Sequence, residues 1–137
     1  MSPETQHGYP GYEQELDSLL VSYGSEAFTR SLLQVYTRDC PLAMIRLMTT
    51  ISSGDLLAAR KAIHSLANIM GIVGPISSRP MIETISADLN DGQLKAAARH
   101  AEELETLVQS ALVSIHDWLG RVSQPAASNG MAFKGND

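Results

Sequence analysis

The imidazole of His64 is the side chain in this sequence best placed to carry chemistry. It lies in a segment whose apolar residues recur at intervals of three and four, the spacing that lines one face of a packed helix. This stripe comprises Leu56, Ala59, Ile63, Leu66, Met70 and Val73. At about 100° per residue, His64 points roughly 135° away from the centre of the stripe. The sequence therefore predicts a nucleophile on the outer face of a rigid helix, with no second catalytic group beside it.

A polar patch surrounds His64 on the same helix face. Arg60 and Lys61 precede the histidine by about one turn, and Asn68 and Gly71 follow it by about one and two turns. Two cations and an amide donor suit a doubly charged phosphoryl group, and a residue without a side chain lets another protein come close. Arg60, Lys61 and Asn68 are therefore the predicted phosphoryl-supporting residues.

The same face also carries apolar residues. Leu57 and Ile72 point away from the buried stripe, at roughly 150° on the same helical wheel. Apolar side chains that flank a polar nucleophile are typical of a docking face. We therefore predict that Leu57, Ala67, Gly71 and Ile72 contact a partner protein.

The remaining candidate nucleophiles and metal ligands form no recognisable site. His7 falls in the N-terminal segment, while His100 and His116 flank the apolar seam of the last predicted helix, where a solvated or edge-packed histidine is expected. No pair of Glu-x-x-His motifs or Gly-rich phosphate loop is present, and the single cysteine, Cys40, excludes an internal disulfide. We expect no metal, no bound cofactor and no ATP-dependent or hydrolytic activity.

Composition narrows the class of protein. A chain of 137 residues with 44% hydrophobic residues predicts one soluble domain with a substantial core. Its net charge of -5 argues against nucleic acid and anionic membrane surfaces as partners. The absence of a secretion signal and of a membrane-length apolar segment, together with the single cysteine, predicts a cytoplasmic protein.

Glycine and proline divide the sequence into helices, and strand signals are weak. A first helix is predicted at 12–23, a third from Asp55 to about Gly74, and a fourth, capped by Ser77 or Ser78, to about Leu89. Pro41 lies within the long second helix and is expected to bend or split it. This second helix, capped by Ser25, runs through Phe28, Leu32, Val35, Leu42, Ile45 and Thr49. The last helix has the most regular stripe, formed by Leu94, Ala97, Ala101, Leu104, Val108, Ala111, Ile115 and Trp118.

These elements predict an all-α protein. Helices with single apolar seams and short connections favour an antiparallel up-down-up-down four-helix bundle, here with a short N-terminal leader helix. The predicted boundaries are a flexible leader at 1–11, the bundle at 12–120 and a flexible C-terminal tail at 121–137.

Three short motifs carry a family resemblance. His64-Ser65-Leu66 is followed by Gly74 ten residues after the histidine; Asp39-Cys40-Pro41 stands in the preceding helix, and Ser53-Gly54-Asp55 opens the histidine helix. In this order and spacing they resemble the signature of histidine-containing phosphotransfer (HPt) domains of bacterial multi-step phosphorelays. The long closing helix and the overall length are similar as well.

The resemblance implies a phosphocarrier with His64 as the phosphoacceptor. The histidine would take a phosphoryl group from the aspartate of one receiver domain and return it to the aspartate of another. The implied partners are response-regulator receiver domains and a sensor histidine kinase of the simple or the hybrid type. Mg²⁺ would be supplied by the receiver, and the domain itself is expected to be a cytoplasmic monomer, either free-standing or part of a membrane-bound hybrid kinase.

Two positions depart from the family pattern. The family usually has lysine three residues and glycine four residues after the histidine, where this sequence has Ala67 and Asn68. Arg60 or Lys61 can replace the missing charge, and Asn68 narrows the approach to the imidazole while offering hydrogen bonds. These departures support an alternative, an HPt-like interaction module that docks a receiver or kinase without carrying phosphate.

A third hypothesis is the dimerisation and phosphoacceptor domain of a sensor kinase. That class usually has an acidic residue directly after the histidine and a Thr-Pro or Asn-Pro nearby. Ser65 and the Ala67-Asn68-Ile69 segment do not fit this pattern. Sedimentation separates the two classes, since the kinase domain is dimeric.

Overall fold

The computed structural model describes residues 8–122, so His7 and most of the predicted tail lie outside the described residues. The described part has five helices and no strand, which confirms the predicted all-α class. The helices are α1 (Tyr12–Tyr23), α2 (Glu26–Ser52), α3 (Leu56–Val73), α4 (Ser78–Asn90) and α5 (Leu94–Val122).

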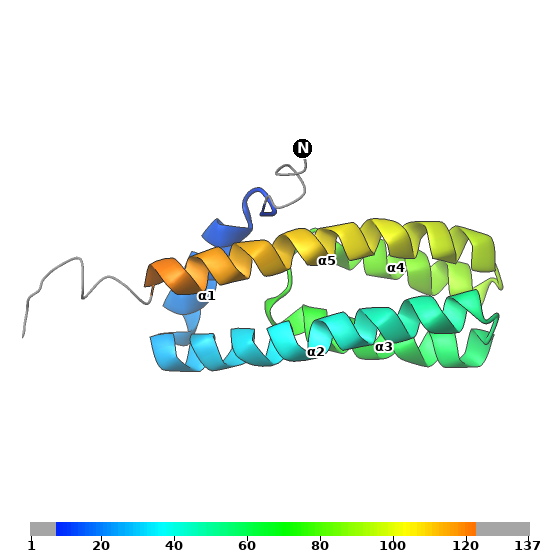
Figure 1. The fold of residues 1–137 in the computed structure, drawn as a ribbon, viewed down its shortest axis with the longest axis horizontal. Coiled ribbons are helices and arrows are strands. Elements are labelled where there is room, and N and C mark those ends of the chain that lie inside the picture. The colour runs from blue at the N-terminus through cyan, green and yellow to red at the C-terminus, as the bar shows by residue number, and fades with distance from the viewer. Residues whose placement is uncertain (1–7, 123–137) are drawn as a thin grey trace, which may run out of the picture.

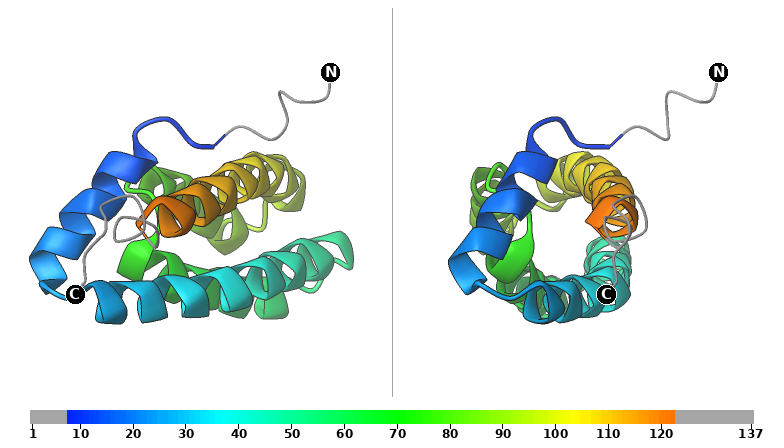
Figure 2. Two further views of the ribbon diagram at one scale, coloured as in Figure 1. Left: turned by 60° about the vertical axis from the view of Figure 1, so that its left-hand side comes forward. Right: turned by 90° about the vertical axis from the view of Figure 1, so that its left-hand side faces the viewer.

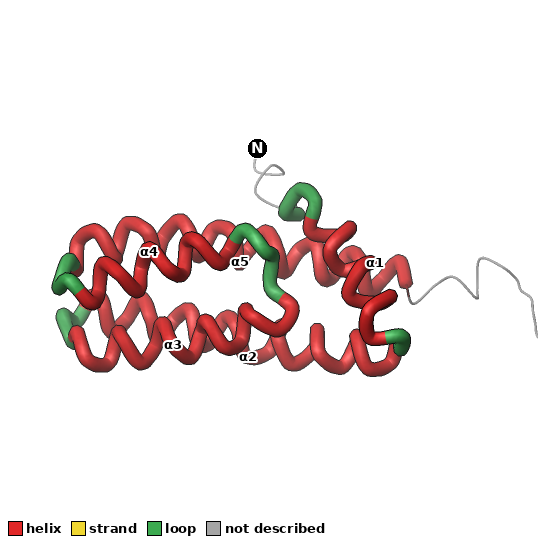
Figure 3. Tube along the Cα trace, turned by 180° about the vertical axis from the view of Figure 1, so that it is seen from behind, coloured by secondary structure: helices red, strands yellow, loops and turns green. Residues whose placement is uncertain are grey.

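The helices pack lengthwise around a shared core (Figure 1). α2 contacts both α3 and α5, and α4 contacts α3 and α5. α3 and α4 are shorter than their neighbours, and the segment that joins them crosses between them partway along the molecule (Figure 3). α1 covers the end where α2 and α5 extend further, packing on both (Figure 2). One side of α3 is thereby left facing solvent.

The predicted stripes of α3 and α5 form the centre of the core. Leu56 and Leu94 are half-buried, and every other residue of the two stripes is buried. Among the helices of residues 8–122, one, α3, is long and apolar enough to cross a membrane, with a mean hydropathy of 1.2. Its residues Ile63, Leu66 and Met70 nevertheless lie in the core of the bundle. Periodicity predicted these two helices well because each has one apolar seam and polar residues elsewhere.

Most of the apolar stripe that predicts α2 faces away from the core, and only its Leu32 packs against the core. Of its members, Val35 is 45% exposed, Leu42 63% and Ile45 59%. The core face of α2 is a different one, formed by Thr29, Leu33, Tyr36, Cys40, Ala43, Met44, Leu47 and Ile51. α2 therefore carries apolar residues on two faces, and only the tertiary packing decides which is buried.

Helix ends follow their predicted chemistry in most places. The Ser25 hydroxyl accepts a hydrogen bond from the Phe28 amide at 3.1 Å, and the Asp55 carboxylate accepts one from Ala58 at 3.1 Å. α2 continues unbroken through Pro41, so the split that Pro41 allowed does not occur. α5 runs past Gly120 to Val122, two residues beyond the predicted end.

The last residues of the predicted flexible leader are fixed to the bundle. The Tyr9 hydroxyl lies 2.6 Å from the Ser77 hydroxyl, and the Tyr9 amide donates to the Ser114 hydroxyl at 2.8 Å. In α1, the Tyr12 hydroxyl donates to the carbonyl of Val73 at 2.6 Å. The leader therefore ties α5 to the segment after α3, although its composition suggested a loose chain.

The buried thiol of Cys40 makes the free energy of unfolding depend on pH. Burial raises the pKa of this thiol from its ordinary value of 9.0 to about 11. The unfolded chain then loses this proton at lower pH than the folded protein, so we expect the free energy of unfolding to fall as pH rises from about 9 to about 11. Urea unfolding at pH 8, 9, 10 and 11 measures this fall. It should be smaller in Cys40→Ala, and an equal fall in both proteins would contradict the assignment.

Candidate functional site

His64 lies midway along the exposed side of α3. The core residues Ile63 and Leu66 face inward beside it, while the imidazole faces solvent. Among residues 8–122, none forms a hydrogen bond or ion pair with the His64 ring. Both ring nitrogens are therefore open to a molecule that approaches from outside.

Most predicted site residues share this exposed side. Lys61, Asn68 and Gly71 are exposed, and Leu57 and Ile72 are 62% and 54% exposed. They place a cation and an amide one turn from His64, with apolar groups about two turns away in both directions. The exposed side of α3 therefore has polar side chains near His64 and apolar side chains further along the helix.

Two predicted site residues are engaged elsewhere. The Arg60 guanidinium donates to the carbonyl oxygen of Leu89, at 3.3 Å from Nε and 3.2 Å from Nη2, and lies 3.5 Å from that of Asn90. These carbonyls end α4, where the backbone leaves acceptors without helical donors and where a positive charge is favoured. Ala67 is half-buried and packs against the core. In this geometry Arg60 links α3 to α4, and Lys61 is the cation on the open side of His64.

The contact of Arg60 with α4 predicts a stability effect. Arg60→Ala removes charge-assisted hydrogen bonds to helix-ending carbonyls, so we expect the free energy of unfolding to fall by about 1 kcal/mol. Lys61→Ala is the matched control on the next residue, and its exposed side chain predicts little change. Chemical denaturation of both variants measures the difference. Equal stability of the two variants would show that the Arg60 contacts contribute nothing.

A shallow apolar groove runs between α2 and α3 close to His64. It has a volume of about 210 Å³, and Asn68, one turn from His64, forms part of its wall. The groove is lined by Leu32, Val35, Tyr36, Asp39, Asn68, Ile69, Ile72 and Val73. Sequence reasoning about α3 alone missed the contribution of α2. The sequence shows that α2 has apolar residues on a second face, but it does not show which neighbouring helix that face lies beside.

The exposed large apolar side chains of residues 8–122 are unevenly distributed among the helices. All of them lie in α1, α2, α3 or the segment after α3, and none lies in α4 or α5. They are Val21, Tyr23, Phe28, Val35, Leu42, Ile45, Leu57, Ile72 and Ile76. Clustered exposed apolar residues mark interaction surfaces more often than scattered ones. The elements around His64 therefore supply the apolar surface that a partner protein could cover.

In the part of the chain that the structure describes, the other groups that titrate or bind metals do not gather into a second site. His100 Nδ1 lies 2.6 Å from a carboxylate oxygen of Asp88, which joins α4 to α5, and His116 is exposed. Within residues 8–122, no three His, Cys, Asp or Glu side chains are arranged to hold a metal ion. The raised pKa of Cys40 keeps its thiol protonated near neutral pH, so it is a poor nucleophile.

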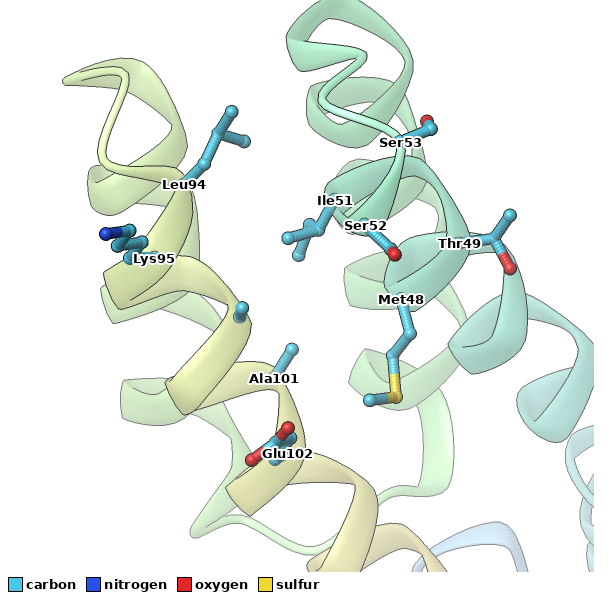
Figure 4. Close-up of a pocket in the computed structure, with 10 residues that line it drawn as sticks. Met48, Thr49, Ile51, Ser52, Ser53, Leu94, Lys95, Ala101 and Glu102 are labelled. Atoms are coloured by element: carbon cyan, nitrogen blue, oxygen red, sulfur yellow. The ribbon is translucent and has the colours of Figure 1, made fainter.

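Another depression on the described surface lies between α2 and α5, and no residue of α3 lines it (Figure 4). It has a volume of about 730 Å³. Met48, Ile51 and Ala101 give it an apolar floor, and Lys95 and Glu102 stand on the α5 side. It contains no histidine or cysteine and therefore adds no nucleophile.

Comparison with protein families, curated proteins and solved structures gave no match for this chain. Fold and site define a helical-bundle protein with a solvent-facing histidine in the middle of α3. Such a histidine can act as a nucleophile or a proton carrier toward a molecule that docks on α3.

Proposed function

We propose that this protein is an HPt-type phosphocarrier that accepts a phosphoryl group on His64 and passes it on. The finer fold belongs to the same proposal: α2 to α5 as an antiparallel up-down-up-down four-helix bundle, with α1 as its leader helix. One observation carries the proposal. The imidazole of His64 is exposed and unengaged at the middle of α3, on the side where apolar residues are also exposed.

The proposed step is a transfer between a receiver aspartate and the imidazole. The lone pair of an unprotonated ring nitrogen of His64 attacks phosphorus, so that an N–P bond forms as the P–O bond to the aspartate carboxyl breaks. The bonding pair leaves with the carboxylate, and the proton on the other ring nitrogen stays in place. The carboxylate of a second receiver reverses this step. The neutral form of an imidazole has this lone pair available on one ring nitrogen.

The chain supplies the nucleophile and the docking surface, and its partner supplies the rest. Phosphoryl transfer depends mainly on positioning and on stabilising charge at the phosphoryl oxygens. The receiver would bring Mg²⁺ to those oxygens, while Lys61 and Asn68 approach them from α3. Leu57 and Ile72 would contact the receiver around the reacting groups. We propose that the protein acts in this way as a cytoplasmic monomer, with a sensor histidine kinase at the head of the relay.

Direct labelling tests the proposed function. Purified receiver domains charged with radiolabelled acetyl phosphate and Mg²⁺ are mixed with the protein, and the label on the protein is followed. A phosphohistidine is labile in acid and stable in base, the reverse of an aspartyl phosphate. Transfer of acid-labile, base-stable label is the expected result. Failure to take up label from any receiver in the panel, and from the small donor phosphoramidate, would refute the proposal.

A second candidate is an interaction module that docks a receiver without carrying phosphate. The engagement of Arg60 by α4 favours it, because Lys61 is then the only cation of the predicted patch that remains on the open side of His64. This candidate predicts receiver binding that is the same in wild type and His64→Ala, with no label on either protein. Titration calorimetry beside the labelling assay distinguishes the two candidates.

A further inference from the structure

The outer side of α2 has a second apolar stripe, separate from the residues that face the core. We call it the outer stripe; it consists of Phe28, Leu32, Val35, Leu42, Ile45 and Thr49. Leu32 is half-buried and the other members are exposed, with Leu42 at 63% and Ile45 at 59%. Four members are seven residues apart, the spacing with which one helix packs lengthwise on another. α2 thus has an apolar face for one more helix, which residues 8–122 do not supply.

The outer stripe has the same spacing in both directions along α2. Successive members are 4, 3, 7, 3 and 4 residues apart, so the stripe is symmetric about the midpoint between Arg38 and Asp39. A contact between two identical surfaces requires such symmetry, because each residue of one copy meets its counterpart about a twofold axis. Two antiparallel α2 helices with their axis at this midpoint therefore place apolar groups together at every level. The pairs are Val35 with Leu42 of the second copy, Leu32 with Ile45, and Phe28 with Thr49.

The charges at the centre of the outer stripe fit the same antiparallel arrangement. The side chains of Arg38 and Asp39 are 70% and 38% exposed. Within one copy the Arg38 guanidinium donates to both carboxylate oxygens of Asp39, at 2.8 and 3.3 Å. The twofold axis sets Arg38 of each copy beside Asp39 of the other, so opposite charges are adjacent. Two parallel helices in register would instead oppose like charges at this level, which is unfavourable.

The outer stripe is large enough for a reversible dimer. From Phe28 to Thr49 the helix rises about 32 Å, and a strip of this length and about two helix diameters wide covers roughly 640 Å². Specific interfaces bury about 1,200–2,000 Å² over both partners, so this face lies near the lower end, where association is weak. The net charge of -5 on each copy also opposes tight association.

A second copy on the outer stripe would lie next to His64. Leu32 and Val35 of the stripe, together with Asp39, also line the groove between α2 and α3. Asn68, one turn from His64, forms part of the other wall of that groove. A copy seated on α2 therefore occupies space that a receiver approaching His64 needs.

We propose that two copies of this chain pair reversibly through the outer stripes of α2, antiparallel about an axis between Arg38 and Asp39, and that this pair is a resting form. The regulatory part rests on the proposed function: the monomer exchanges phosphoryl groups with receivers, and pairing hinders their approach to His64. Pairing that is lost on dilution also differs from the permanent dimer of a sensor-kinase domain.

Sedimentation of the full chain tests the pairing. Over concentrations from about 10 μM to about 1 mM, the range in which small interfaces associate, we expect the mean mass to rise from 14.8 kDa toward twice that value. Leu42→Glu puts a charge into the apolar contact and should weaken self-association at least about tenfold. Val21→Glu is the matched control, because Val21 is 80% exposed but lies on α1. This control should associate as wild type does.

Charge reversal tests the twofold axis. Arg38→Asp and Asp39→Arg each oppose like charges across the axis, so each variant alone should associate more weakly than wild type. An equimolar mixture of the two variants sets opposite charges against each other again and should recover association. A pair of charges that acted only within one chain could not produce this recovery.

The label assay tests the regulatory part. At a fixed amount of phosphorylated receiver, we expect the rate constant for uptake by wild type to fall at least about threefold as its concentration rises through the range of pairing. Leu42→Glu should keep a constant rate constant over the same range. Uptake from phosphoramidate should not change with concentration in either protein, since this small donor needs no docking surface.

Four results would overturn part or all of the inference. Wild-type protein that stays at 14.8 kDa up to about 1 mM would refute pairing. Equal association by wild type and Leu42→Glu would place the contact on another face, and a mixture that fails to recover would refute the axis. Pairing without any effect on uptake from the receiver would refute the resting form. Pairing by a protein that takes up no label from any donor would refute the proposed function but support the pairing of α2.

Discussion

Replacing His64 with glutamine is expected to reduce phosphoryl uptake by about a hundredfold or more while leaving the fold intact. Glutamine is close in size and polar, but its amide nitrogen has no lone pair free for attack on phosphorus. The imidazole is exposed and makes no bond to any residue in the range 8–122, so its loss removes no structural contact. The measurement is label from phosphorylated receiver and from phosphoramidate, together with a thermal unfolding curve.

The other histidines of the described chain are the controls for this result. His116 is exposed on α5, and His116→Gln should keep full uptake. His100 pairs with Asp88, so His100→Gln should lower stability modestly without removing label. Undiminished label on His64→Gln, or loss of label in His116→Gln, would show that the phosphoacceptor is not on α3.

Replacing Trp118 with alanine is expected to produce the largest loss of stability. Trp118 is fully buried, and its indole Nε1 donates to a carboxylate oxygen of Asp17 at 2.8 Å, which joins α5 to α1. Removing a buried tryptophan side chain costs about 3–5 kcal/mol through lost burial and the cavity that remains. This is a large part of the 5–15 kcal/mol that ordinarily stabilises a domain. Urea denaturation and the midpoint of thermal unfolding, expected to fall by roughly 10–20 °C, measure it.

Trp118→Phe separates the packing of the ring from its hydrogen bond. Phenylalanine keeps an aromatic ring in the core but cannot donate to Asp17, whose carboxylate is exposed and can be rehydrated. We expect this variant to lose about 1–2 kcal/mol. A Trp118→Ala variant within 1 kcal/mol of wild type would mean that α1 and the end of α5 do not share the core.

The elements predicted best from the sequence are the helices whose apolar residues all lie on one face. The stripes of α3 and α5 each have a single apolar face, so burial and periodicity agree, and His64 falls opposite the buried face of α3. The cap residues Ser25 and Asp55 were equally predictable, because their side chains bond to backbone amides three residues away. Local rules of this kind need no knowledge of the rest of the chain.

Helical spacing does not predict the contacts that form where distant segments meet. Arg60 belongs to the His64 patch by spacing, but the end of α4, 29 residues away in sequence, offers its guanidinium a set of carbonyl acceptors. Tyr9 stands in a segment rich in glycine and proline, yet it bonds to Ser77 and Ser114. Helical spacing describes one helix at a time, so it carries no information about partners on another.

By itself the sequence determined an all-helical class and placed His64 on the outer side of its helix, because the period of the apolar residues fixes which way each side of α3 points. The tertiary structure decided which of the two apolar faces of α2 is buried and which lines a groove near His64. It also decided which cation stays beside the histidine, and that Gly71 is open to solvent. The physical reason is that burial and hydrogen bonding across helices depend on where the neighbouring helices lie.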